Sequence, residues 1–198
     1  MIHDLYEVFG SYIKSLEMIR LGEGKKPVVR HLFTRQELEK VYDFCKLNGL
    51  YLELSPLKIA LADDTDFSNK GVFVDRKHPE GLYVAYISKN ELLAKKASLA
   101  ELQQDHRTLG VLLGYPPCCI RFFEREIQDS KTMDLTHEPE HPLTNLSKRH
   151  KDIALLSHFP CSPHCEHSKN IAAENFFLLK EYAPGLASVF LKELQIKK

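Results

Sequence analysis

The sequence has no excess of charge of either sign and no long apolar run. Its 27 basic side chains balance its 27 acidic ones, which gives a formal net charge of zero. Proteins that grip nucleic acid through its phosphates normally carry a basic surface, so we expect no general nucleic-acid binding. No signal peptide is recognisable at the start, and no apolar run is long enough to cross a bilayer. We therefore expect no membrane partner.

The five cysteines are unevenly spread along the chain. Four fall in two short stretches, residues 113–124 and 159–166, and the fifth is Cys45. Cysteines without a secretory signal favour metal ligands, redox groups or reduced thiols, and intracellular disulfides are typical only of hyperthermophiles. Because Cys45 fits the apolar stripe of a predicted helix, we interpret it as a core residue. The chemistry is expected in the other two stretches.

Each of these stretches is predicted to begin a helix. In the first, GYPPCC, Gly114 can end one helix in the left-handed conformation, and Pro117 suits the first position of the next. In the second, PCSPHC, Ser162 is a good N-cap and Pro163 a good first helical residue. A helix N-terminus favours a thiolate through its unpaired N–H groups and its dipole. The sequence thus predicts a cysteine site assembled from two helix starts.

Four cysteines belong to this predicted site. Cys118, Cys119 and Cys165 are expected in first turns of helices, and Cys161 just ahead of one. We predict that the two stretches meet in space, although 41 residues lie between Cys119 and Cys161.

A metal centre is one interpretation of the four thiols, which match the ligand set of zinc or of an iron–sulfur cluster. Nearby histidines could add nitrogen ligands, so the candidate metal ligands are Cys118, Cys119, Cys161, Cys165, His158 and His164. Adjacent helical residues point about 100° apart. Both Cys118 and Cys119 would therefore reach one ion only if the first turn is distorted; otherwise one binds while the other packs inward.

Two other interpretations stay open. A thiol-dependent enzyme would use a cysteine at a helix N-terminus, with His106, His158 or His164 as its acid or base. A non-catalytic interaction module would instead be held together by intracellular disulfides between the two stretches. The sequence leaves open whether the protein is an enzyme.

The strings GYPPCC, followed by an apolar helix, and PCSPHC, followed by a second helix, resemble an archaeal family catalogued as domain of unknown function 483. The matching motifs cover about a quarter of the chain. The resemblance implies an archaeal, cytoplasmic protein and supplies no mechanism.

The fold class predicted from the periodicity is α+β: a small, mostly antiparallel sheet with N-terminal helices, then a mostly helical region with the cysteines. We expect a first part over residues 1–95 and a second over 96–198; no Gly/Ser- or Pro-rich linker separates them, so they can share one core. The predicted strands are residues 28–33, 51–54, 58–62, 71–74 and 82–87. The predicted helices are residues 2–21, 34–48, 90–113 (one broken or two consecutive), 117–127, 150–158, 164–181 and 184–196.

Taken together, these patterns predict a cytoplasmic protein with a cysteine-rich site that binds zinc or an iron–sulfur cluster. Its partner is expected to be a small molecule or a protein. Its reaction, if it has one, does not follow from the sequence.

Overall fold

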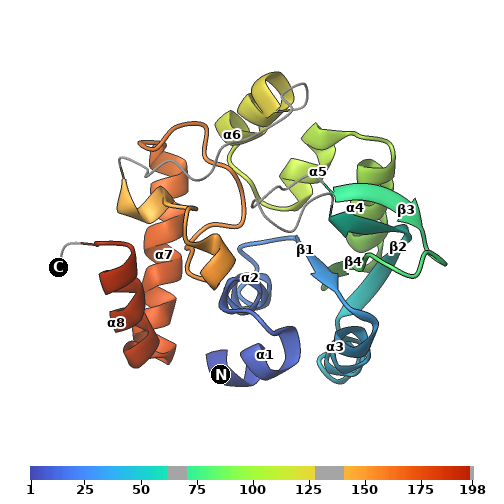
Figure 1. Cartoon of the computed structure of the whole chain (residues 1–198), viewed down its shortest axis with the longest axis horizontal. Helices are drawn as coiled ribbons and strands as arrows, with labels where there is room; N and C mark the ends of the chain where they lie inside the picture. The colour runs from blue at the N-terminus through green and yellow to red at the C-terminus, as the bar shows by residue number, and fades with distance from the viewer. Residues whose placement is uncertain (62–70, 128–140, 197–198) are drawn as a thin grey trace. The chain divides into compact units, whose positions relative to one another are not determined.

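The structure is a computed structural model that describes residues 1–61, 71–127 and 141–196 (Figure 1). These ranges hold eight α-helices and one four-stranded antiparallel sheet, which confirms the predicted α+β class. None of the described helices is both long and apolar enough to span a membrane. The chain divides into two compact units: a cysteine unit, Met1–Glu17 with Pro116–Lys198, and a sheet unit, Met18–Tyr115.

The sheet unit is built on four antiparallel strands in the order β1-β4-β2-β3. The strands are β1 (Val28–Phe33), β2 (Tyr51–Leu61), β3 (Gly71–Asp75) and β4 (Leu82–Ser88). The sequence predicted two strands where β2 is one long strand whose register against β4 shifts between Leu54 and Lys58. Pro56 lies inside this shift, and because proline has no N–H to donate to the ladder, it suits an irregular position.

Helices cover this sheet through closely packed side chains. They are α3 (Arg35–Leu47), α4 (Glu91–Leu102) and α5 (His106–Leu112). Small side chains on α4, Ala94, Ala97 and Ala100, pack in one cluster with Val84 and Tyr86 of β4. Successive residues of a strand point to opposite faces, and β4 is buried at consecutive positions, so both faces of the sheet are covered there.

Helix α3 lies within the predicted helix over residues 34–48 and begins at the N-cap Thr34. The Thr34 hydroxyl accepts a hydrogen bond from the Glu37 N–H, and the Glu37 carboxylate accepts one from the Thr34 N–H, which is a complete capping box. Cys45 on this helix is buried, and burial raises the pKa of its thiol to about 12. It is a core residue, as predicted.

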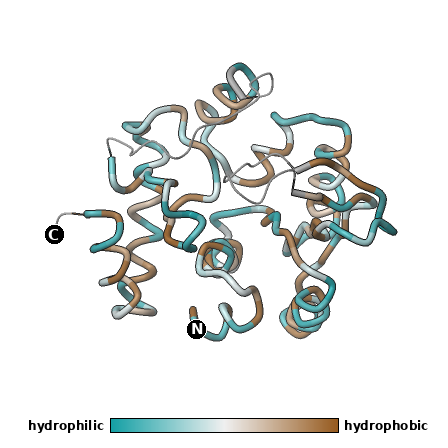
Figure 2. Tube along the Cα trace, in the orientation of Figure 1, coloured by the Kyte–Doolittle hydropathy of each residue, from teal (hydrophilic) through white to brown (hydrophobic). Residues whose placement is uncertain are grey.

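The cysteine unit is helical. Its helices are α1 (Ile2–Phe9), α6 (Pro117–Phe122), α7 (Glu166–Tyr182) and α8 (Pro184–Glu193), with a π-helical turn η1 (Phe123–Ile127) and 3-10 turns η2 (Pro142–Thr144) and η3 (Arg149–Lys151). Helix α2 (Tyr12–Gly22) starts in this unit and carries the chain into the sheet unit. Apolar and polar residues alternate along α7 and α8 (Figure 2), and the buried ones include Phe176, Leu179 and Phe190.

The predicted single helix over residues 2–21 is interrupted. Gly10 ends α1 in the left-handed conformation, with φ 67°, and its N–H donates to the Tyr6 carbonyl at 2.7 Å. Glycine adopts this conformation without the steric cost that a Cβ brings. The chain then restarts as α2 at Tyr12.

The predicted helix over residues 150–158 is wrong, because only the short turn η3 forms there. Asp152 follows that turn in the left-handed conformation, with φ 59°. Its carboxylate accepts hydrogen bonds from the Ser11 hydroxyl at 2.6 Å and from the Tyr12 and Ile13 N–H groups at 2.5 and 3.3 Å. A residue 140 positions away from Tyr12 thus caps the N-terminus of α2.

We expect Asp152→Ala to lower the free energy of unfolding by about 2 kcal/mol, because it removes a helix cap and because alanine tolerates the left-handed region less well than aspartate. Asp152→Asn should cost less, since asparagine tolerates that conformation and its amide oxygen still accepts hydrogen bonds. Urea unfolding of both variants measures the difference. Equal stability of the alanine variant and the wild type would show that the cap contributes nothing.

Candidate metal centre

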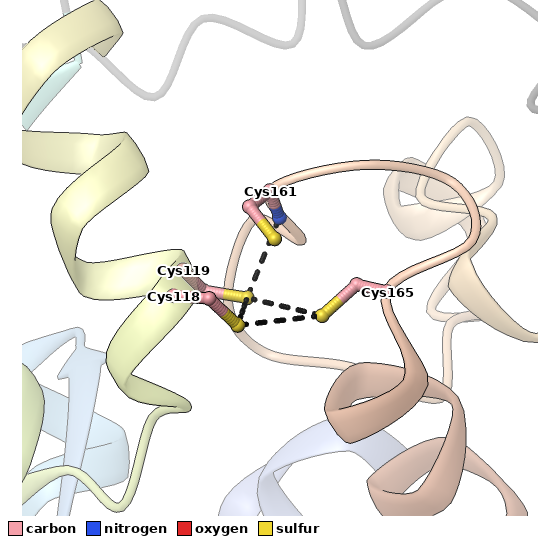
Figure 3. Close-up of side chains that lie close together, drawn as sticks. All are labelled: Cys118, Cys119, Cys161 and Cys165. Atoms are coloured by element: carbon pink, nitrogen blue, oxygen red, sulfur yellow. Dashed lines mark hydrogen bonds between the residues drawn. The ribbon is translucent and has the colours of Figure 1, made fainter.

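Sulfur atoms from the two predicted stretches lie together in the cysteine unit (Figure 3). They form a cysteine cluster in which all sulfurs lie within 4.8 Å of one another, and its members are Cys118, Cys119, Cys161 and Cys165. The Cys165 sulfur is 3.7 Å from that of Cys118 and 3.7 Å from that of Cys119. The prediction that the two stretches meet is confirmed.

The first stretch lies at the predicted break between two helices. Gly114, with φ 68°, follows α5, and its N–H donates to the Val111 carbonyl while the Tyr115 N–H donates to the Gly110 carbonyl. This pair of bonds is the Schellman motif that often ends a helix at glycine. Pro117 then opens α6 as its first residue, as predicted.

Both neighbouring thiols of α6 reach the cluster. Cys118 and Cys119 are the second and third residues of the helix, and their sulfurs are 3.9 Å apart. The sequence left open whether one of the two thiols packs away from the other cysteines, and both sulfurs lie in the cluster. In Figure 3 both side chains point from the start of α6 toward Cys165.

The second stretch starts its helix later than predicted. Residues 162–165 form a turn in which the Cys165 N–H donates to the Ser162 carbonyl at 3.1 Å, and Cys165 itself is the N-cap of α7. Ser162 is thus not the N-cap, and Pro163 is not the first helical residue. The Thr144 hydroxyl donates to the Pro163 carbonyl at 2.8 Å, so a distant segment holds this turn.

Hydrogen bonds reach the buried half of the cluster. Cys119 and Cys165 are 3% and 6% exposed, whereas Cys118 and Cys161 are partly exposed. The Cys161 N–H donates to the Cys119 sulfur at 3.4 Å, and the Ser168 hydroxyl lies 3.3 Å from the same sulfur. N–H and O–H donors favour a thiolate over a thiol.

The thiols differ in acidity. Burial raises the pKa of Cys119, and burial with the contacts to the Cys165 and Cys118 thiols raises the pKa of Cys161 to about 11. Burial also disfavours the Cys165 thiolate, but the Ser168 hydroxyl and N–H outweigh it and lower the pKa of Cys165 to about 6. Cys165 is the N-cap of α7, and the unpaired N–H groups and dipole of a helix start favour a thiolate there.

The two candidate histidine ligands lie outside this group of four sulfurs. His158 is buried, and its Nε2 is 2.9 Å from the Ser168 hydroxyl. The ring of His164 lies edge-on to that of His141, with 6.0 Å between the ring centroids. Ser168 was not predicted, although it stands three residues after Cys165 on α7, a spacing that places two side chains on one helix face.

The cluster can hold a metal ion, and it contains no disulfide. The sulfurs of Cys118, Cys119 and Cys165 are 3.7 to 3.9 Å apart, far longer than a disulfide bond of about 2.05 Å. All five cysteines are free thiols. The predicted alternative of disulfides between the two stretches is therefore not found.

A family model described as "Protein of unknown function (DUF483)" matches residues 90–188, half of the chain, and the match includes the whole cysteine cluster. Comparisons with curated proteins and with solved structures found no match. The family predicted from the two cysteine-containing strings is confirmed, and the chain belongs to the DUF483 family of proteins of unknown function.

Proposed function

We propose that the cysteine cluster binds one zinc ion through four thiolates, and that this ion is structural. It joins the start of α6 to the start of α7. On this proposal the protein is a zinc-stabilised module, and its cysteines do not carry a reaction.

The sulfur spacing is the observation that supports this proposal. Four sulfurs arranged as a tetrahedron at about 2.3 Å from zinc are about 3.8 Å apart. The distances within the cluster that join Cys118, Cys119 and Cys165 are 3.7, 3.7 and 3.9 Å. Zinc thus fits at the centre of these sulfurs without moving the helices that carry them.

The same spacing favours one ion over an iron–sulfur cluster. In such a cluster the four cysteines are shared among two or more iron atoms, so some of the ligating sulfurs must stand well apart. Here the sulfurs all lie within 4.8 Å of one another. This compactness supports a single metal ion rather than several iron atoms.

The number of ligands supports a structural role. Structural zinc sites are usually closed by four protein ligands, whereas catalytic sites keep a position for water or substrate. Four cysteines supply the complete set, so neither His158 nor His164 is needed as a ligand. Two of the four, Cys119 and Cys165, are also buried.

Charge gives a further reason for a cation. Four thiolates this close repel one another, and without an ion most of them must stay protonated. The raised pKa values of Cys119 and Cys161 reflect burial and this proximity. A divalent cation removes the repulsion and displaces the protons, which couples metal binding to folding.

We expect one zinc ion per chain after anaerobic purification, measured by native mass spectrometry and elemental analysis. Cys161→Ser and Cys165→Ser should lose the ion. Their melting temperatures should fall by roughly 5–10 °C, because saturating ligand at about 100 times its Kd adds about 2.7 kcal/mol of stability.

Cys45→Ser is the matched control, since it replaces a buried cysteine of α3 that lies outside the cluster. It should keep one zinc ion whatever its effect on stability. Visible absorbance with bound iron would reject zinc. A metal-free wild type, with unchanged melting curves for Cys161→Ser and Cys165→Ser, would reject a structural metal altogether.

A thiol-dependent activity is the second candidate, because Cys165 combines a lowered pKa with a place at the N-cap of a 17-residue helix. Those are properties of reactive cysteines. A thiol-dependent activity needs a Cys165 thiolate that is free to attack a substrate, whereas a metal-bound Cys165 would be held by the ion.

In the metal-free, reduced protein, we expect alkylation of Cys165 to rise between about pH 5 and pH 7 and then level off, because its pKa is about 6. Cys45, with a pKa of about 12, should stay unlabelled over this range. Peptide mass spectrometry after short iodoacetamide pulses measures both. Zinc should suppress the Cys165 reaction; rapid labelling that zinc does not slow would favour the thiol enzyme.

A further inference from the structure

Two buried polar side chains line the buried half of the cysteine cluster. Ser168 is 0% exposed and His158 is 4% exposed. The Ser168 hydroxyl is 2.9 Å from the His158 Nε2 and 3.3 Å from the Cys119 sulfur. One hydroxyl thus connects a histidine to the sulfur of Cys119.

The direction of these hydrogen bonds follows from the number of protons. A hydroxyl carries one hydrogen and can accept through its lone pairs. A metal-bound thiolate can only accept, so beside it the Ser168 hydroxyl must donate to sulfur. The Nε2 of His158 must then be the donor to the serine oxygen, which fixes this ring nitrogen as N–H.

We propose that Ser168 and His158 are positioning residues for the metal centre, forming a hydrogen-bond relay from His158 through Ser168 to the Cys119 thiolate. This inference rests on the proposed zinc site. The relay directs two aligned dipoles toward the negative charge of the Cys119 sulfur. It orients this buried ligand and strengthens its hold on the ion.

The relay makes Cys119 unlike the other cysteines of the cluster. Its sulfur lies beside the Ser168 hydroxyl and accepts a hydrogen bond from the Cys161 N–H. Cys119 is also buried, whereas Cys118 and Cys161 are partly exposed. Outer partners of this kind commonly change metal affinity by about 10- to 100-fold when removed. Cys119 is therefore the ligand whose bond to the ion depends most on its surroundings.

Ser168→Ala tests the relay, and Ser15→Ala is its matched control. Ser15 is also 0% exposed and in the same unit, but its hydroxyl donates to the Ser11 carbonyl at 2.7 Å. We expect Ser168→Ala to weaken zinc binding by about 10- to 100-fold in competition with a chromophoric chelator. Ser15→Ala should bind zinc as the wild type does, although both variants lose a buried hydrogen bond.

Cobalt(II) loaded in place of zinc gives a charge-transfer band that reports on the hydrogen bond to sulfur. A residue that only supports the fold would leave this band unchanged. A hydrogen bond to a thiolate stabilises the sulfur lone pairs, so its loss should shift the sulfur-to-cobalt charge-transfer band to longer wavelength. Ser168→Ala should show this shift and Ser15→Ala should not. His158→Phe should show a smaller shift in the same direction, and His158→Gln, which keeps an N–H donor, should restore the band.

The outcomes separate the relay from the metal site itself. If the wild type binds one ion and Ser168→Ala keeps both its affinity and its charge-transfer band, the relay is overturned and the zinc site stands. If the wild type binds neither zinc nor cobalt, the zinc site is overturned, and the relay with it. Should Ser168→Ala fail to fold, the His158→Phe and His158→Gln pair decides: identical bands in the two variants and the wild type overturn the relay.

Discussion

Repulsion between four sulfur atoms in a small volume is the constraint on which the cysteine unit depends. The sulfurs come from the start of α6, from a turn and from the N-cap of α7. Placing negative charges within 4.8 Å of one another is unfavourable unless protons or a cation neutralise them. The two helix starts can therefore keep their positions only if the charge of the cluster is neutralised. The fold of this unit is thus linked to the protons or the cation that neutralise it.

The features of this fold that depend only on neighbouring residues could be predicted from the sequence. They include the capping box at Thr34 and Glu37, the left-handed Gly114 and the proline at the start of α6. The strings GYPPCC and PCSPHC also identified the cluster cysteines and the family. These features were predictable because neighbouring side chains alone decide them.

The features that were missed depend on contacts between distant residues. Helix α7 was predicted to be capped by Ser162 but is capped by Cys165, after a turn that Thr144 holds by a hydrogen bond. The segment after η3 was predicted as a helix but is irregular, and its Asp152 caps α2. The role of Ser168 required knowing that its helix face meets Cys119. Periodicity along the chain contains no information on such partners, since the competing local structures are similarly favourable.

The cysteine unit is assembled from two pieces of chain, Met1–Glu17 and Pro116–Lys198, with the whole sheet unit between them in sequence. During synthesis the first helix leaves the ribosome long before the elements that share its unit. Its apolar residues Ile2, Leu5 and Phe9, buried in the finished protein, must wait for them. The sheet unit is continuous in sequence and can fold first. On the zinc proposal, all four ligands are present only after the second cysteine stretch has emerged.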